Sequence, residues 1–154
     1  MPPSTKDQTM KESQYNLEER LLDYAANIIR LVERLPGTRA GNHVAGQLLR
    51  CGTSPLSNHG EAQASESRND FIHKFSICLK ELKESRRWLR LAKRVPLIKA
   101  PTEFDPLLEE TEALIKIFAT SIRTAQRNAD HSSLTSNPPV RASNNTGRSL
   151  NVER

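Results

Sequence analysis

Aromatic residues are scarce in this chain, since Trp, Tyr and Phe together make up 5% of its 154 residues. A densely packed core must therefore be built mainly from aliphatic side chains. Cysteine is also rare: Cys51 and Cys78 lie in apolar or small-residue surroundings and form no close pair. We interpret both as reduced core residues of a cytoplasmic protein, because disulfide frameworks and zinc motifs use more, or differently spaced, cysteines.

Long apolar segments and the usual catalytic motifs are missing as well. No apolar run approaches the ~18 residues of a membrane span. The polar N-terminus MPPSTKDQTMKES has no apolar region of the kind found in a secretory signal. The chain contains no glycine-rich phosphate loop, GxSxG motif or paired-cysteine zinc motif. We expect no membrane contact, no cofactor and no catalytic residues.

Polar composition separates both ends of the chain from its middle. Residues 1–15 lack apolar periodicity, and residues 129–154 are rich in Ser, Asn and Pro. Such segments bury too little apolar surface to offset the entropy lost on ordering. We therefore predict disordered termini at 1–15 and 129–154, around one folded domain at 16–128.

Four helical segments account for that domain, which has almost no strand-like pattern. Three of them, at about 17–35, 67–94 and 105–125, carry apolar residues at intervals of three and four. Asn16, Ser67 and Asp105 are expected N-caps, and Pro106 would occupy the first helical position of the last segment. Short connections between the segments predict an all-α, antiparallel up-down-up-down four-helix bundle.

The second segment, at about 38–65, is unusually rich in Gly, Ala and Ser. Each interior glycine costs a helix ~1 kcal/mol, so such a helix is useful where a neighbour approaches closely. Pro55 predicts either a kink or a fresh turn capped by Ser54, and we expect a kinked second helix between larger ones. Asn58 and Glu61 would face a crowded interface. Because they lack a base or nucleophile partner, we expect hydrogen bonding at a helix or subunit junction, not catalysis.

The sequence LLRCGTSPLSNHGEAQASESRNDFIHKFSICLKELKESRRWLRLA, at 48–92, resembles a known family. These are the bacterial four-helix bundle proteins encoded by intervening sequences in large-subunit ribosomal RNA genes, and they include the accessory variability determinant of diversity-generating retroelements. The resemblance covers roughly residues 17–128. In one departure, Pro55 stands three residues before Asn58, where many relatives place it two before or lack it. The matching positions are Gly52, Thr53, Ser54, Asn58, Glu61, Ala62, Ser67, Phe71 and Lys74.

This resemblance carries expectations about assembly and partners. Known relatives form homopentamers, and the retroelement member binds nucleic acid and a reverse transcriptase. Most other relatives have no established activity. The resemblance therefore implies a homopentamer, with Asn58, Glu61, Ser67 and Phe71 as the structural or oligomer motif.

The third segment carries the sharpest charge feature. Residues 74–94 contain eight basic residues against Glu81 and Glu84, an excess of +6 that exceeds the net charge of +5 for the whole chain. Spacings of 3, 4, 3 and 4 place five of the basic residues on one helix face, which we call the basic stripe. Its members are Lys80, Lys83, Arg87, Arg90 and Arg94. Arg86 and Lys93 flank the stripe, and we include Arg86 among the candidate nucleic-acid-binding residues.

Two interpretations of the basic stripe remain open. It could bind the phosphates of RNA or DNA, with Trp88 beside it to stack on a base. It could instead be a solvated face whose cations suit the C-terminal dipole of the helix, with Trp88 used in packing. The corresponding functions are a non-enzymatic, homo-oligomeric nucleic-acid-binding protein, RNA being the expected ligand, and an oligomeric scaffold for a protein partner. We expect no metal site at His43, Cys51 and His59, because a spacing of eight does not align them on one helix face.

Overall fold

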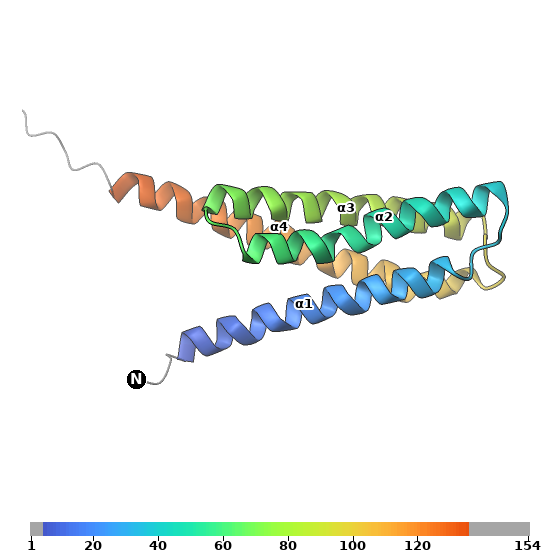
Figure 1. Cartoon of the computed structure of the whole chain (residues 1–154), viewed down its shortest axis with the longest axis horizontal. Coiled ribbons are helices and arrows are strands. Elements are labelled where there is room, and N and C mark those ends of the chain that lie inside the picture. The colour runs from blue at the N-terminus through green and yellow to red at the C-terminus, as the bar shows by residue number, and fades with distance from the viewer. Residues whose placement is uncertain (1–4, 136–154) are drawn as a thin grey trace, which may run out of the picture.

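The computed structural model describes residues 5–135, and the side chains of residues 16–130. Within this range it contains helices α1 (Thr5–Val32), α2 (Arg39–Gln63), α3 (Arg68–Arg94) and α4 (Asp105–Thr135). A short 3₁₀ helix, η1 (Pro101–Phe104), precedes α4, and the described residues contain no strand. Successive helices run in opposite directions (Figure 1). The predicted all-α, up-down-up-down four-helix bundle is confirmed.

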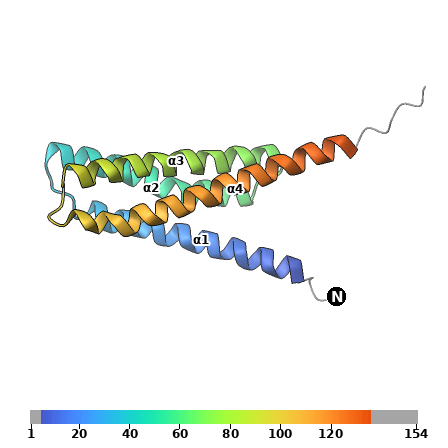
Figure 2. The ribbon, with the colours of Figure 1, turned by 180° about the vertical axis from the view of Figure 1, so that it is seen from behind.

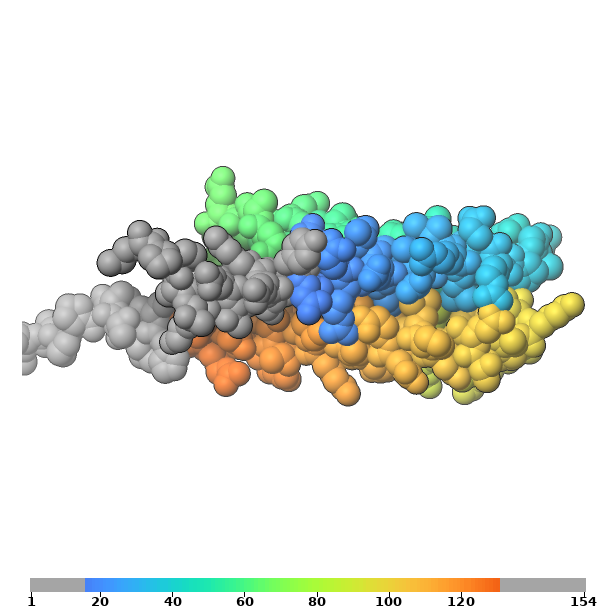
Figure 3. Space-filling view, turned by 90° about the horizontal axis from the view of Figure 1, so that it is seen from below, coloured from blue at the N-terminus to red at the C-terminus, as the bar shows by residue number. Residues whose placement is uncertain are grey.

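The four helices are packed to different extents. α3 lies at the centre of the contacts, most extensively against α2 and then against α4, while α1 packs mainly on α2. Figures 1 and 2 show that the N-terminal end of α1 diverges from the other three helices. Along one side of the bundle α1 lies beside α4 (Figure 3, blue beside orange). There Arg20 donates to both carboxylate oxygens of Glu110, at 3.0 and 2.9 Å.

The apolar stripes predicted for α1, α3 and α4 form the core. Tyr24 is the largest polar side chain within it, and its hydroxyl lies 2.8 Å from Thr111 Oγ1. Thr111 itself donates to the Leu107 carbonyl at 2.6 Å, so Tyr24 is the donor of the pair. Burial raises the pKa of Tyr24 to about 12. The buried members of the three stripes are Leu21, Tyr24, Ile28, Leu31, Phe75, Cys78, Leu82, Ser85, Leu89, Ala92, Leu107, Thr111, Leu114, Ile115, Phe118 and Ile122.

The small residues of α2 permit a close approach at particular positions. A Cβ atom at Gly52 would lie 2.7 Å from Ile28 Cγ1 of α1, whereas one at Gly46 would meet nothing within 4 Å. α2 continues through Pro55, so the alternative of a fresh turn capped by Ser54 is wrong. The Pro55 ring is buried, and its carbonyl oxygen accepts from Cys78 Sγ at 3.5 Å. Pro55 therefore lies inside α2, at its contact with α3.

Helix boundaries show where the predictions held and where they failed. Ser67 is the N-cap of α3, as predicted, and its hydroxyl accepts from the Asp70 N–H at 3.1 Å. The predicted cap at Asn16 is wrong, because α1 begins at Thr5. Asp105 is not an N-cap either: it has helical φ and ψ of −63° and −46°, directly after η1.

The predicted disordered termini overlap the described helices in part. α1 covers residues 5–15 of the first segment, and α4 covers 129–135 of the second. Both helices therefore extend beyond the predicted domain limits of 16 and 128. Residues 1–4 and 136–154 of these segments lie outside the described residues.

Candidate nucleic-acid interface

The basic stripe lies on the outer face of α3. Its five side chains are all exposed, whereas the residues of the opposite face, such as Phe75, Leu82 and Leu89, are buried. At a rise of 1.5 Å per residue, the fourteen steps from Lys80 to Arg94 span about 21 Å. No side chain in the described part of the chain forms an ion pair with any of the five. The stripe is therefore a straight row of uncompensated positive charge.

Arg86, the sixth candidate residue, has a different environment. Its Nη1 donates to both carboxylate oxygens of Glu112 on α4, at 3.0 and 3.2 Å. Lys93, on the same side of α3, pairs with Asp105, at the start of α4. Their charges are used to join α3 to α4, so the structure brings five of the six candidate residues together and separates Arg86 from them.

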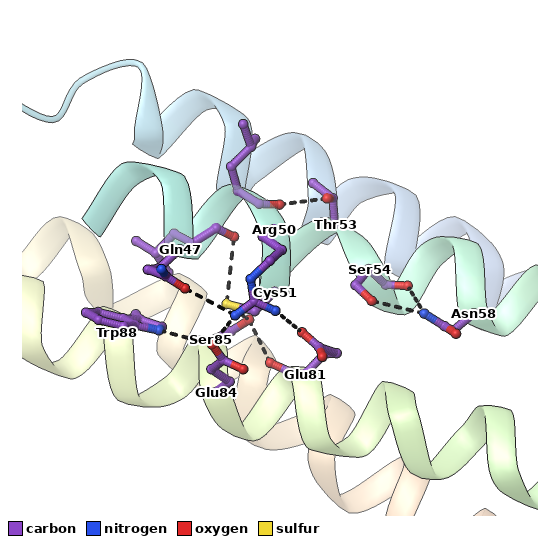
Figure 4. A network of polar contacts seen from close by, with 12 residues as sticks. Gln47, Arg50, Cys51, Thr53, Ser54, Asn58, Glu81, Glu84, Ser85 and Trp88 are labelled. Atoms are coloured by element: carbon purple, nitrogen blue, oxygen red, sulfur yellow. Dashed lines mark hydrogen bonds and ion pairs between the residues drawn. The ribbon is translucent and has the colours of Figure 1, made fainter. Parts of the chain in front are cut away.

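The two acidic residues of the stretch are held on the side of α3 that faces α2. Arg50 of α2 donates from Nη1 to Glu81 Oε2 at 3.1 Å and pairs through Nη2 with Glu84 (Figure 4). Glu81 is buried, so this pairing compensates a carboxylate with little access to water. Because both carboxylates pair with Arg50 of α2, neither forms an ion pair with a cation of the basic stripe.

Trp88 belongs to the same α2-facing side. Its indole N–H points toward Glu84 Oε1 at 3.4 Å (Figure 4). Its ring meets His43 edge-on, with the ring centroids 5.5 Å apart. The side chain is half-buried and packs against the apolar core. These contacts match the packing interpretation of Trp88 and leave the stripe without an aromatic residue of its own.

Two hollows lie at the C-terminal end of the stripe and share Arg90 and Arg94. The smaller, of about 220 Å³, also involves Arg87 and Leu91. The larger, of about 530 Å³, lies between α3, η1 and α4. Its lining residues are Arg90, Lys93, Arg94, Pro101, Leu108 and Glu112.

The family motif lies near the turn between α2 and α3, away from the C-terminal end of the stripe. The Asn58 amide donates to the carbonyl and to the hydroxyl of Ser54, both at 3.0 Å (Figure 4). Glu61 pairs with Lys74 across the two helices. Phe71 packs on Phe75 with centroids 4.2 Å apart. Of these contacts, the Glu61–Lys74 pair joins the end of α2 to the start of α3, while the others and the Ser67 cap each lie within one helix.

His59 is a polar core residue whose burial sequence reasoning missed. It is 1% exposed and lies between Phe75 and Phe118, with centroid distances of 5.9 and 6.5 Å. Its Nε2 lies 3.3 Å from Gln63 Nε2, while Nδ1 is buried without a partner among the described residues. Burial lowers its pKa, although Glu18 of α1 opposes the effect. Its position four residues after Pro55, on the buried register of α2, is the signal that could have found it.

Reactive or metal-binding chemistry has little support in the described part of the chain. Cys51 and Cys78 are both buried, and burial raises the pKa of each thiol, that of Cys78 to about 12. A thiol with so high a pKa is a poor nucleophile at neutral pH. The described residues contain no group of three or more His, Cys, Asp or Glu that could hold a metal ion. None of the described helices is both long and apolar enough to cross a membrane.

Comparison with known proteins identifies a family and solved structures that resemble the chain. Residues 13–120 match the model of a family described as 23S rRNA-intervening sequence protein. One of the solved structures is a protein of unknown function from the S23 ribosomal protein family of Bacteroides thetaiotaomicron, with 29% sequence identity and a TM-score of 0.66. The alignment covers 71% of this chain and 97% of that one. No curated protein matches the chain.

Proposed function

The chain belongs to the 23S rRNA-intervening sequence protein family, and on that premise we propose that it is a non-enzymatic accessory protein that binds nucleic acid. The contact surface is the basic stripe of α3, and RNA is the proposed ligand. One observation carries the proposal: five exposed cations stand in one row of about 21 Å, with no acidic partner among the described residues.

The row is unfavourable for the free protein. Each member of the stripe lies three or four residues from the next, which makes four neighbouring pairs of like charge. Two of them, Lys83 with Arg87 and Arg90 with Arg94, are four residues apart, a spacing at which like charges destabilise a helix by roughly 0.2–0.5 kcal/mol for each pair. A face that served only solubility would gain from alternating signs, and α3 instead directs Glu81 and Glu84 toward α2. Binding of a polyanion would relieve the repulsion.

The helix dipole accounts for only part of the stripe. Its favourable effect on cations is confined to the last turn of a helix. Arg94 lies in that turn, but Lys80 and Lys83 lie more than ten residues before the end of α3. The helix dipole therefore does not explain the cations in the N-terminal half of the stripe, whereas contact with phosphates does.

Side chains of this type favour backbone contact over base recognition. Lysine and arginine on an open helix face neutralise phosphates, which positions a nucleic acid without reading its sequence. Trp88, the aromatic residue nearest the stripe in sequence, is already engaged by Glu84 and His43. We therefore propose affinity with little sequence preference and a strong dependence on salt.

We also propose that the protein acts as a homo-oligomer in the cytoplasm, as a pentamer by resemblance to known relatives. Leu22 and Ile29, one heptad apart on α1, are 49% and 45% exposed, and they supply the apolar surface that a subunit contact needs. On α3, Leu91 is 44% exposed and can add to this surface, whereas Ile72 and Leu79 are partly buried and pack against the core. A ring of subunits would multiply the stripe and the counterions released on binding.

The exposed apolar face of α1 also favours the second candidate, a scaffold that binds a protein partner and no nucleic acid. A reverse transcriptase is the partner suggested by the retroelement relative. An electrophoretic mobility shift with a structured RNA at two salt concentrations distinguishes the two functions. Nucleic-acid binding that weakens with salt supports the first, and absence of any shift near physiological salt supports the scaffold.

A further inference from the structure

The larger hollow at the end of the basic stripe combines charge and apolar surface. α3 contributes Arg90, Lys93 and Arg94 to it, η1 contributes Pro101, and α4 contributes Leu108 and Glu112. Its volume of about 530 Å³ falls within the range of roughly 300–1,000 Å³ that is typical of small-molecule sites. The neighbouring hollow of about 220 Å³ is below this range.

Ion pairs leave a net positive charge at this hollow. Lys93 is compensated by Asp105, and Glu112 by Arg86. Arg90 and Arg94 have no ion-pair partner in the described chain, so two uncompensated guanidinium groups remain on its α3 side. A guanidinium can donate two parallel hydrogen bonds to a phosphate, which makes this wall suited to two adjacent phosphates or to one held from two sides.

The side of the hollow that η1 and α4 form carries two apolar residues beside Glu112. Pro101 and Leu108 are both partly exposed there and offer aliphatic surface at the junction of η1 and α4. A nucleobase that is not stacked in a duplex can lie against apolar side chains and stack on arginine planes. The smaller hollow has only Leu91 besides its arginines.

We propose that the larger hollow takes up one unpaired nucleotide of the nucleic acid that lies along the stripe. The inference rests on the proposed function and adds the kind of RNA bound. The base lies against Pro101 and Leu108, while its flanking phosphates pair with Arg90 and Arg94. A duplex that contains a bulged nucleotide is then preferred to an uninterrupted duplex, because its extra base is already unpaired.

The test uses the full chain and two RNA duplexes of the same sequence, one of which has a single unpaired nucleotide at its centre. Fluorescence anisotropy titrations give both affinities at one salt concentration. The wild-type protein is expected to bind the bulged duplex about tenfold more tightly, because only its unpaired base can cover the apolar surface of Pro101 and Leu108. Leu108→Gln removes one of the two apolar residues and keeps the charge, so the ratio should fall toward 1 while affinity for the uninterrupted duplex stays unchanged.

Leu91→Gln, at the smaller hollow, is the matched control and should keep the tenfold ratio. Should Leu108→Gln lose helical circular dichroism, Pro101→Ser tests the other apolar wall. Equal affinity of the wild type for the two duplexes overturns this inference and leaves the proposed function standing. Loss of the ratio in Leu91→Gln also overturns it, and failure of the wild type to bind either duplex overturns both.

Discussion

Gly52 of α2 faces Ile28 of α1 so closely that a Cβ atom would lie within 2.7–2.9 Å of three side-chain carbons of Ile28. Those carbons belong to a fully buried residue and have little room to move. Gly52→Ala should therefore lower the free energy of unfolding by about 1–3 kcal/mol, the range for overpacked cores. Urea titration followed by circular dichroism measures the change.

Gly46→Ala is the matched control, since a Cβ atom there meets nothing within 4 Å. On the same helix it should raise the free energy of unfolding by up to ~1 kcal/mol through helix propensity. A Gly52→Ala protein as stable as Gly46→Ala would contradict the close approach of α1 to α2.

The buried imidazole of His59 should make stability depend on pH. Burial between Phe75 and Phe118 lowers its pKa in the folded state, so below the ordinary value of about 6.5 the unfolded chain binds a proton that the folded chain does not. The contribution of the neutral His59 imidazole to the free energy of unfolding is complete above that pH. It is lost as pH falls, by at most ~1.4 kcal/mol per pH unit. Glu18 is the charged group that opposes the effect, and Gln63 is the neutral neighbour.

His59→Leu should flatten this dependence between pH 7.5 and 5.5, as measured by urea unfolding at each pH. His73 is exposed on α3, and His73→Leu should leave the wild-type dependence in place. If the free energy of unfolding changed equally with pH in the wild type and in His59→Leu, the pH dependence would not arise from protonation of His59.

Arg50 compensates two carboxylates of α3, of which Glu81 is buried. Arg50→Met should leave Glu81 without its cation and lower the free energy of unfolding by about 1–3 kcal/mol. Glu81→Gln in the same chain should recover much of this loss, because the neutral amide needs no counter-charge. A double-mutant cycle measures the coupling, and additive effects of the two changes would refute the interaction.

The exposed pair Leu22 and Ile29 is expected to lie in a subunit contact. Leu22→Glu combined with Ile29→Glu should give a monomer with unchanged helical content, because neither side chain is part of the core. Multi-angle light scattering at tens of micromolar measures the mass. Asp23→Lys, at an exposed polar position of α1, should remain oligomeric. A monomeric wild type at this concentration would rule out the assembly.

Periodicity predicted the elements whose residues are buried, and it failed where helices are polar. The stripes through Tyr24, Leu82 and Phe118 appear as predicted because apolar side chains must face one another across the bundle. Residues 5–15 are part of α1 although they carry no such stripe. Their polarity led to a prediction of disorder, whereas their helix-forming composition favours the helix that is observed. Asp105 was predicted to be an N-cap because Pro106 follows it. The 3₁₀ helix η1 ends directly before Asp105, so the backbone of Asp105 is already helical.

The candidate site was predictable only as far as one helix determines it. Spacing alone placed Lys80, Lys83, Arg87, Arg90 and Arg94 on one face, and they do share it. The separation of Arg86 depends on Glu112, 26 residues later, whose position is set by the packing of α4. The pairing of Arg50 with Glu81 likewise joins residues 31 apart. Contacts between residues so far apart in the sequence cannot be predicted from the spacing of residues within one helix.

The central claim is that the basic stripe contacts phosphates. Each phosphate contact adds about 0.9 to the slope of log affinity against log salt for a duplex, so the stripe can contribute up to about 4 or 5 per subunit. Lys83→Gln, Arg87→Gln and Arg90→Gln in one chain should keep helicity and assembly, because all three side chains lie away from the buried face. RNA affinity should fall by a similar factor for different sequences.

The decisive measurement is the salt dependence of RNA affinity for the wild type and this triple variant, from titrations between about 50 and 200 mM salt. We predict a slope that is shallower in the variant by up to about 3 per subunit, together with weaker binding at every salt concentration. Equal affinity and equal slope in the two proteins would contradict the account and leave the basic stripe as a solvated face.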